Sequence, residues 1–405
     1  MLQRIFPSYY RHLVRMAWRD PQKIPSMMRL KLARRDNIPP PPGQRVPPPL
    51  VIAVRPTYNC NLRCLMCNQW GENGVFMKWP KRFVRREMTT QDFKDFFDEV
   101  SSFKPYIYFT GGEPLLAKDT LELIRYASSR HLVTSMSTNS TLLQDKAEEV
   151  IRSGLDYIYL SLDAPAPCDK EVIRRQVNRQ DSNQRAVDSI RHLLELRDEL
   201  GIGLPVVQIQ TIIVKENQYK LLEMAHFVED VLQPDVWGLQ LCVHTTPELS
   251  AATTRIYQEN FGQDQVGWEG FVRVFTSDMN FEEISWQLET IMSSRWKFKL
   301  RIYSPTGLPG FDLRRYYLEP ERDSCDLQNF SCMNPYVFAQ LQPNGDIAFC
   351  GSQPDYIVGN VKQHSFLDVW NSKRAQKWRH FLQKHSFPVC KRCFSLHEYQ
   401  RFTKS

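Results

Sequence analysis

The chain of 405 residues has no run approaching the roughly eighteen apolar residues that a membrane-spanning helix needs. No signal peptide is visible, because arginines interrupt the apolar residues near the start. No internal repeat and no known nucleic-acid-binding motif stands out. Its hydrophobic content of 42% is enough for one large domain and a smaller one. We therefore expect a cytoplasmic protein without a nucleic-acid partner.

The ten cysteines are unevenly spread, with three between positions 60 and 67 and five beyond position 324. A disulfide framework is typical of small secreted domains and not of a long chain without an export signal. The clustering therefore indicates reduced thiols that bind a metal or an iron–sulfur cluster.

The positive charge is concentrated at the start of the chain. Residues 1–36 contain nine Lys or Arg and two Asp, whereas the rest contains 43 residues of each sign. Apolar side chains within residues 2–13 recur at helical spacing, although Pro7 interrupts them, so a continuous helix is expected to begin only there. This basic amphipathic arm can lie peripherally on the anionic inner face of a membrane, or it can pack on the body with its arginines solvated. Residues 37–50 are half proline and predict a stiff, extended linker.

Strand-like and helix-like segments alternate after the linker. Strands are expected at residues 51–58, 106–111, 133–139, 157–163, 206–214 and 236–243, with helices between most of them. This alternation predicts a parallel sheet covered by helices, either an open wound sheet or a partial (βα)6 TIM-like barrel. In such folds the chemistry lies at the carboxyl ends of the strands. The unusual residues of this chain follow the first four strands in turn, so we expect one site there.

The first of these segments is Cys60-Asn-Leu-Arg-Cys64-Leu-Met-Cys67, with the spacing C-x3-C-x2-C. Three thiolates in a short loop can ligate three irons of an iron–sulfur cube and leave the fourth iron open. A structural zinc site normally has four protein ligands, and no nearby Cys or His completes this one. The spacing therefore favours a cluster that binds and acts on a small molecule.

Together these segments resemble the radical S-adenosylmethionine (SAM) superfamily, over residues 50–245 and again over 325–399. Residues 110–114 resemble the family's Gly-Gly-Glu motif, residues 137–139 the segment after its third strand, and residues 161–163 its fourth-strand segment. Singly, the glycines would indicate a turn and the carboxylates helix caps, but their joint placement favours the SAM site. The resemblance implies a [4Fe–4S] cluster on the three cysteines, and SAM contacts from Met66, Gly111, Gly112, Glu113, Asn139, Ser161, Asp163 and Arg174.

The chemistry that the resemblance implies belongs mostly to the cofactor. A reducing partner such as flavodoxin or ferredoxin supplies an electron, the cluster cleaves SAM to a 5′-deoxyadenosyl radical, and the radical abstracts hydrogen from a substrate. Oxidation, epimerisation and bond formation are all open as outcomes. The basic arm suggests a membrane-adjacent substrate, and a peptide substrate is a further alternative.

A second group of cysteines lies near the end of the chain. Cys332 and Cys350 flank Gly345 with the spacing C-x12-G-x4-C, and Cys390-x2-Cys393 follows. By spacing alone, zinc and a second iron–sulfur cluster fit equally well. The stretch resembles the SPASM or twitch extension of radical SAM enzymes. The resemblance implies one auxiliary [4Fe–4S] cluster on these four cysteines, because none follows them.

Three cysteines lie outside both groups. Cys325 is near the second group, Cys168 follows the fourth strand, and Cys242 lies near the carboxyl end of the sixth. A thiol at position 242 can give a hydrogen atom to a substrate radical, as some radical SAM epimerases require, although a free cysteine is more often a small buried hydrophobe.

The sequence therefore predicts a partial (βα)6 barrel with a small C-terminal cysteine-rich iron–sulfur domain. The expected parts are an arm (1–36), a linker (37–50), a radical SAM barrel (51–245), a bridging region (246–324) and an auxiliary-cluster domain (325–399). The rival hypothesis is a non-catalytic iron–sulfur electron carrier or zinc scaffold, which would form no 5′-deoxyadenosine from SAM.

Overall fold

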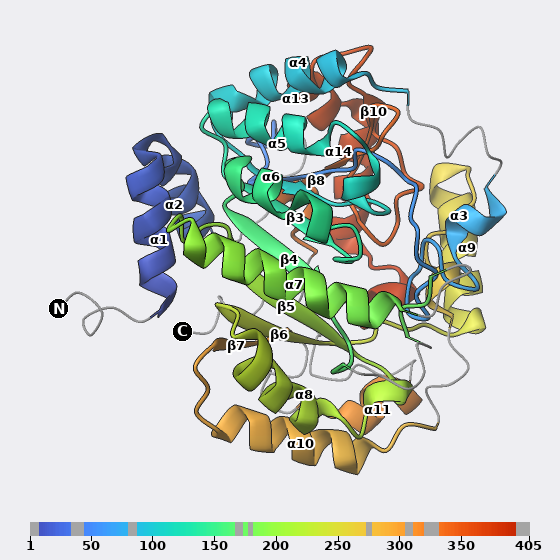
Figure 1. Cartoon of the computed structure of the whole chain (residues 1–405). Coiled ribbons are helices and arrows are strands. Elements are labelled where there is room, and N and C mark those ends of the chain that lie inside the picture. The colour runs from blue at the N-terminus through green and yellow to red at the C-terminus, as the bar shows by residue number, and fades with distance from the viewer. Residues whose placement is uncertain are drawn as a thin grey trace.

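The computed structural model describes residues 8–33, 44–79, 87–166, 173–176, 181–272, 278–303, 311–319 and 332–393. Their strands form one sheet in the order β10-β9-β8-β1-β2-β3-β4-β5-β6-β7 (Figure 1). Neighbouring strands from β8 to β7 in this order are parallel, and the β8–β9 and β9–β10 pairs are antiparallel. The strands are β1 (Val51–Val54), β2 (Tyr106–Phe109), β3 (Thr134–Thr138), β4 (Tyr157–Ser161), β5 (Val206–Ile213), β6 (Val236–Leu241), β7 (Lys299–Ile302), β8 (Phe338–Leu341), β9 (Asp346–Ala348) and β10 (Gly359–Asn360).

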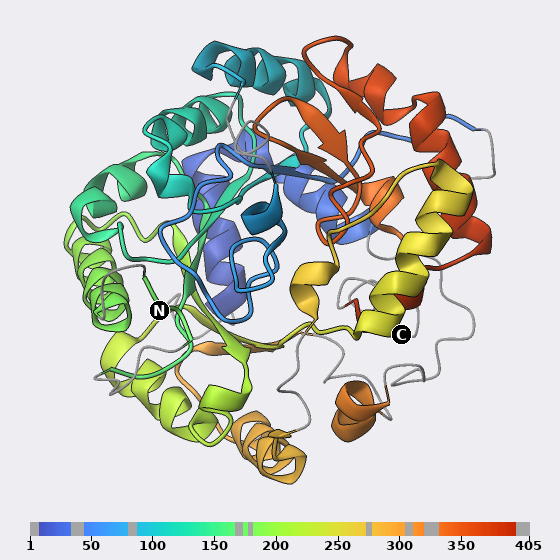
Figure 2. The same ribbon diagram turned by 90° about the vertical axis from the view of Figure 1, so that its right-hand side faces the viewer.

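Helices form a ring around the strands (Figure 2). Their bounds are α1 (Ser8–Arg19), α2 (Ile24–Ala33), α3 (Val75–Lys78), α4 (Thr90–Val100), α5 (Thr120–Ser129), α6 (Ala147–Arg152), α7 (Ser182–Glu199), α8 (Leu221–Phe227), α9 (Pro247–Phe261), α10 (Phe281–Ser293), α11 (Leu313–Leu318), α12 (Asn334–Val337), α13 (Phe366–Trp370) and α14 (Lys373–Lys384). The expected partial TIM-like barrel is confirmed, with all six expected strands present and each ending one to four residues earlier than expected.

Side chains alternate along the central strands between a fully buried and a half-buried face. On β2, Ile107 and Phe109 are fully buried, whereas Tyr106 and Tyr108 are half-buried. Because side chains point to opposite faces of a strand in turn, the apolar set packs under the helices and the tyrosines face the barrel interior. The interior of this barrel is therefore polar, as the hydrogen bond of 2.6 Å between Tyr108 Oη and Ser137 Oγ also shows.

Helices α1 and α2 close the amino-terminal end of the barrel. Met16 on α1 is buried against Val133, Val206 and Val236, which lie at or beside the starts of β3, β5 and β6. Helix α1 is described from Ser8 onwards, so the expectation that a continuous helix begins only at Pro7 lies outside the described residues. The apolar stripe expected over residues 2–13 lies outside the residues whose side chains the structure describes.

Basic side chains of the arm are hydrogen-bonded to the body instead of being solvated. Lys23, between α1 and α2, is fully buried, and its Nζ donates to Asp156 Oδ2 at 2.8 Å and to Ser128 Oγ at 3.0 Å. Arg19 forms an ion pair with the same carboxylate and donates to Gly154 O at 2.8 Å. The arm is thus packed on the body, with these two cations paired to a buried carboxylate.

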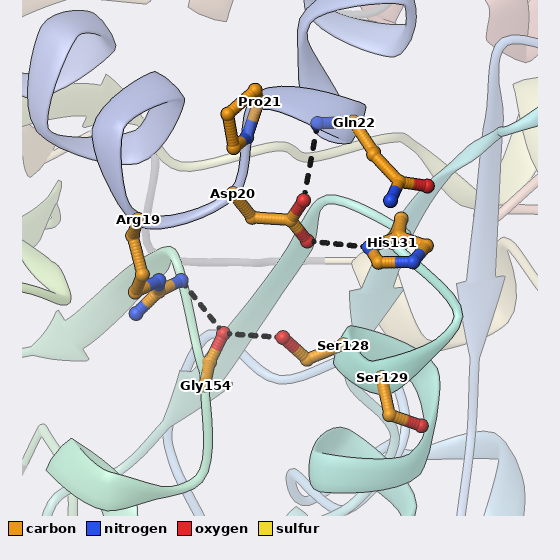
Figure 3. A pocket seen from close by; sticks show the side chains of 8 residues that line it. All are labelled: Arg19, Asp20, Pro21, Gln22, Ser128, Ser129, His131 and Gly154. Atoms are coloured by element: carbon orange, nitrogen blue, oxygen red, sulfur yellow. Dashed lines mark hydrogen bonds and ion pairs between the residues drawn. The ribbon is translucent and has the colours of Figure 1, made fainter.

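A hollow of about 630 Å³ lies between the arm and the body. Figure 3 shows that its polar groups already face one another: Asp20 Oδ2 lies 2.9 Å from His131 Nδ1, and Ser128 Oγ donates to Gly154 O at 3.1 Å. It lies at the amino-terminal ends of the strands, away from the cysteine loop. Within the described ranges no helix is long and apolar enough to cross a membrane.

Candidate active site

Three thiols lie in the loop that follows β1, as the sequence predicts. Cys64 is 8% exposed, and Cys60 and Cys67 are half-buried. The backbone N–H of Leu62 donates to Cys60 Sγ and that of Gln69 to Cys67 Sγ, each at 3.4 Å. Such donors stabilise thiolates and help to set the reduction potential of a cluster bound to them.

Burial makes these thiols costly to ionise without a metal. It raises the pKa of Cys60 to about 12 and that of Cys64 to about 12. A bound metal offsets that cost, because its charge favours the thiolate. Within the described parts of the chain, no three His, Cys, Asp or Glu side chains gather closely enough to hold a single metal ion. Three thiolates can ligate three irons of a cube, whereas a structural zinc site normally has four protein ligands.

Two glycines bring the loop after β2 into direct contact with the cysteine loop. Gly111 has φ +133°, and a Cβ there would lie 2.5 Å from Thr57 O; a Cβ on Gly112 would lie 2.0 Å from Asn59 O. The close approach permits two hydrogen bonds, Gly112 N–H to Thr57 O at 3.1 Å and Glu113 N–H to Asn59 O at 2.8 Å. Any side chain at these positions would separate the loops. The glycines thereby hold Glu113 against the thiol-bearing segment.

Glu113 is a buried carboxylate, only 1% exposed. Its Oε1 accepts from Leu115 N at 3.1 Å and Thr138 Oγ1 at 2.8 Å, and its Oε2 accepts from Asn139 N at 2.8 Å. Burial raises the pKa of this carboxyl to about 7, although the hydrogen bonds act in the opposite direction. These hydrogen-bond donors are neutral groups, so an incoming ammonium group would supply the missing positive charge.

Asn139 links the end of β3 to the cysteine loop. Its Nδ2 donates to Asn61 Oδ1 at 2.9 Å, and Asn61 Nδ2 donates to Thr141 Oγ1 at 2.9 Å. Ser161, the last residue of β4, is half-buried and continues the interior-facing set of that strand. Both residues therefore lie at the carboxyl ends of the strands, where the sequence predicts them.

Asp163 and Arg174 form an ion pair beside the thiols. Arg174 Nε lies 2.5 Å from Asp163 Oδ2, and Arg174 Nη1 lies 4.0 Å from Cys64 Sγ. Asp163 Oδ1 also accepts from Ile212 N at 2.7 Å, which ties it to β5. Leu65 N donates to Ile173 O at 2.9 Å, so the segment of Arg174 is paired with the cysteine loop. Burial alone would lower the pKa of this guanidinium, but Asp163 and Cys64 raise it, so the group is a fixed positive charge.

Met66 and Cys242 lie in one small apolar group with Cys64. Cys242 is 3% exposed, and its N–H donates to Ile213 O at 3.2 Å. The structure thus places the thiol at the end of β6 in the same apolar group as a thiol of the first cysteine loop. Cys168 and Cys325 lie outside the described residues.

The four C-terminal cysteines influence one another's ionisation. Burial, together with the smaller effect of Cys393, raises the pKa of Cys332 to about 12. The pKa of Cys390 is raised by burial and then by Cys332, Cys393 and Cys350. Coulombic effects of this kind fall with distance, so the four thiols lie in one neighbourhood of the fold. Within the described residues no three of them gather closely enough to hold a single metal ion.

The bridging region supplies residues that the sequence did not reveal. Helix α11 places Tyr317 over His244 with ring centroids 4.8 Å apart, and Tyr317 Oη donates to Cys242 O at 3.1 Å. The neighbouring Tyr316 Oη donates at 3.2 Å to the backbone oxygen of Arg392, which lies between two cysteines of the second group. The position of His244, just after the carboxyl end of β6, is a signal that could have found this contact, but it was not among the predicted site residues. These contacts link Cys242 to the second cysteine group through α11.

Comparisons with known proteins agree with this architecture. The Radical SAM superfamily matches residues 54–228, and the SPASM iron-sulfur cluster-binding domain matches residues 332–394. The tungsten-containing aldehyde ferredoxin oxidoreductase cofactor-modifying protein of Pyrococcus furiosus is 23% identical, over 86% of this chain and 88% of that one. An AdoMet-dependent heme synthase of Oleidesulfovibrio alaskensis is 24% identical, over 82% and 76%. Streptococcus suis SuiB bound to precursor peptide SuiA has the same fold, with a TM-score of 0.57 and 16% identity over 86% and 70%.

A partial barrel with three thiols after its first strand and four in a C-terminal extension defines an iron–sulfur enzyme. The two domain matches together cover more than half of the chain, and the protein belongs to the radical SAM superfamily and carries a SPASM domain. Its cofactors are therefore a [4Fe–4S] cluster, SAM and an auxiliary iron–sulfur centre.

Proposed function

We propose that this enzyme binds its [4Fe–4S] cluster through Cys60, Cys64 and Cys67, and the amino-acid end of SAM between Glu113 and Arg174. A buried carboxylate and a partly buried guanidinium beside the thiols carry the proposal. Glu113 is a carboxylate whose hydrogen-bond donors are neutral, and Arg174 is a guanidinium 4.0 Å from Cys64 Sγ. The ammonium and carboxylate groups of an amino acid complement this pair.

The other expected SAM contacts lie in the cysteine loop or at the carboxyl ends of the neighbouring strands. Asp163 acts through Arg174, because its carboxylate holds the guanidinium beside the cysteine loop. When bound, the cluster and SAM supply a 5′-deoxyadenosyl radical that abstracts hydrogen from a substrate. The further contacts that we propose are Met66, Gly111, Gly112, Asn139 and Ser161.

We propose that Cys332, Cys350, Cys390 and Cys393 hold one auxiliary [4Fe–4S] cluster. Their mutual effect on pKa supports a single site. A protein of the flavodoxin or ferredoxin class is the proposed electron donor. Oxidation, epimerisation and bond formation are the reaction classes to distinguish, and SuiB, which shares this fold, makes a peptide the first substrate class to test.

Anaerobic reconstitution tests the whole proposal. The wild type should hold about eight irons per chain, as expected for two cubes, and form 5′-deoxyadenosine from SAM when reduced. Replacing Cys60, Cys64 and Cys67 with Ala should remove about four irons and abolish SAM cleavage. An electron carrier or zinc scaffold would form no 5′-deoxyadenosine at any iron content, and that result would refute the proposal.

We also propose Cys242 as a hydrogen-atom donor to the substrate radical. The support is its place in one apolar group with Cys64 and Met66. In that role, Cys242→Ser should still cleave SAM but should lose solvent deuterium incorporation into the product. Unchanged deuterium incorporation would assign this thiol to packing alone.

A peripheral membrane contact of the arm is a separate proposal. Four large apolar side chains of α1 and α2 are exposed, namely Val14, Trp18 (84%), Ile24 and Met28. They belong to the segment that holds the net positive charge of the chain, and aromatic side chains next to cations favour an anionic lipid surface. Because the arm closes the amino-terminal end of the barrel, the cysteine loop would face away from such a membrane, which favours an aqueous substrate.

Vesicle co-sedimentation tests this contact. Trp18→Ala should reduce binding to vesicles of mixed neutral and anionic lipid, and binding to purely neutral vesicles should be weak. Trp286→Ala, which removes a half-exposed tryptophan from α10, is the matched control. Equal binding of both variants and the wild type, or no binding to anionic vesicles, would contradict the proposal.

A further inference from the structure

Arg55 is a buried cation at the carboxyl end of β1, five residues before Cys60. It is 3% exposed, and its N–H extends the β1–β8 ladder by donating to Leu341 O at 3.0 Å. Its Nη1 donates to Gln342 Oε1 at 3.4 Å. In the amide orientation that satisfies both groups, Gln340 Oε1 accepts from Arg55 Nε and Nη2, both at 2.9 Å.

The hydrogen-bond partners of this guanidinium are neutral amides. The third of them is Gln69 of the cysteine loop. In the amide orientation that satisfies both its groups, its Oε1 accepts from Arg55 Nη2 at 3.1 Å and its Nε2 donates to Gly111 O at 3.1 Å. Amides satisfy the N–H groups but do not neutralise the charge, and a buried charge without a counter-charge costs several kcal/mol. Burial accordingly lowers the pKa of Arg55, although Tyr58 and Cys67 act to raise it.

The neighbouring thiols are the groups that can supply a negative charge to balance Arg55. Arg55 lies close enough to Cys67 for the thiolate to stabilise its charge, and through Gln69 and Gly111 it is bonded to both loops of the SAM site. A cube held by three thiolates has a net negative charge, which increases when the cube is reduced. Nearby net charge is one of the terms that set the reduction potential of such a cluster.

We propose that Arg55 is a tuning residue for the SAM-binding cluster, whose buried positive charge offsets the charge of the cluster and raises its reduction potential. The inference rests on the proposed cluster site at Cys60, Cys64 and Cys67. Gln340 and Gln342 position the guanidinium, and they come from strand β8, so the C-terminal part of the chain contributes to the electrostatics of the first site.

The test is a potentiometric titration of the reconstituted full-length chain followed by electron paramagnetic resonance. The signal that changes when SAM is added reports the SAM-binding cluster, and the other signal reports the auxiliary cluster. Arg55→Gln should lower the midpoint potential of the first signal alone, and Arg55→Lys should restore it towards the wild-type value, because the charge returns.

A second variant keeps the test valid if loss of Arg55 disturbs the loop. Gln342→Glu is nearly isosteric and places a carboxylate beside the guanidinium, so it should lower the same midpoint with a full complement of iron. Arg197→Gln is the control, because it removes a buried arginine that is paired with Asp235 at the other end of the strands, and it should leave the potential unchanged.

Wild-type potentials in both Arg55→Gln and Gln342→Glu, with full iron, would overturn the inference while leaving the cluster site intact. An iron content that does not fall when Cys60, Cys64 and Cys67 are replaced would instead overturn the proposed function, and this inference with it. The two failures are thus separated by iron analysis before any potential is measured.

Discussion

The contact between the Gly-Gly-Glu loop and the cysteine loop makes Gly112→Ala a quantitative test of the site. The added Cβ would lie 2.0 Å from Asn59 O and 2.3 Å from Tyr58 O, both backbone atoms that cannot rotate away. The loop must therefore retreat by about 1 Å, which stretches the hydrogen bonds Gly112 N–H to Thr57 O and Glu113 N–H to Asn59 O. Two such bonds at about 1 kcal/mol each, with about 1–3 kcal/mol for overpacking, give a loss of about 3–5 kcal/mol.

Chemical denaturation of the apoprotein measures this loss, and calorimetric titration with SAM measures its effect on binding. Gly262→Ala is the matched control: it lies at the end of α9 with φ +67° and open space around its Cβ position, so it should cost only about 1–2 kcal/mol and leave SAM affinity unchanged. We expect Gly112→Ala to lose much more stability and to bind SAM weakly. Equal stabilities of the two variants, with equal SAM affinity, would refute the idea that the loops touch as described.

Three further predictions concern other parts of the molecule. Because the pKa of Glu113 is raised from 4.5 to about 7, its contribution to apoprotein stability is fully present below pH 4.5 and is lost as the pH rises through 7. The free energy of unfolding, measured by denaturation, should fall by about 3 kcal/mol as the pH rises across that range. A Glu113→Gln variant should lack this pH dependence. Asp156→Asn should leave Lys23 buried without its carboxylate, lower the free energy of unfolding by about 3–5 kcal/mol and expose the arm to proteolysis; an unchanged melting temperature would contradict this. Cys350→Ala should reduce iron from about eight to about four per chain while SAM binding persists, and a full iron count would remove Cys350 from the ligand set.

The barrel strands were predictable because their signal is local. The runs that became β2 and β4 alternate tyrosines with wholly apolar residues, and the alternation follows directly from one face under the helices and one facing the interior. Strand β7 was missed because Lys299–Ile302 is a short edge strand whose first residue is exposed. The parallel pairing of β8 with β1 joins residues far apart in the chain, and no local pattern encodes such a pairing.

Some residues of the candidate site could likewise be predicted from local motifs, and others depend on contacts between distant parts of the chain. Glu113 and Asn139 were identified from local motifs at strand ends, and the structure brings them into direct hydrogen bonding. Arg55 is not part of a recognisable motif. Its proposed role depends on glutamines in and just after β8 and on a cysteine twelve residues away. Tyr317 lay in a region without a recognisable pattern, and its role follows from a contact with Cys242, seventy-five residues away.

The pairing of β1 with β8 has a consequence for how the two cysteine groups work together. Strand β1 leads into the first group, and β8 leads through the hairpin of β9 to Cys350, two residues beyond its end. Because β1 and β8 are registered residue by residue, from Val51 opposite Phe338 to Val54 opposite Leu341, the two groups are attached to adjacent strands of one ladder. Their separation is therefore fixed by backbone hydrogen bonds, which do not yield to a single side-chain change. Helix α11 adds a second link, because Tyr317 Oη donates to Cys242 O and Tyr316 Oη donates to Arg392 O between two cysteines of the second group.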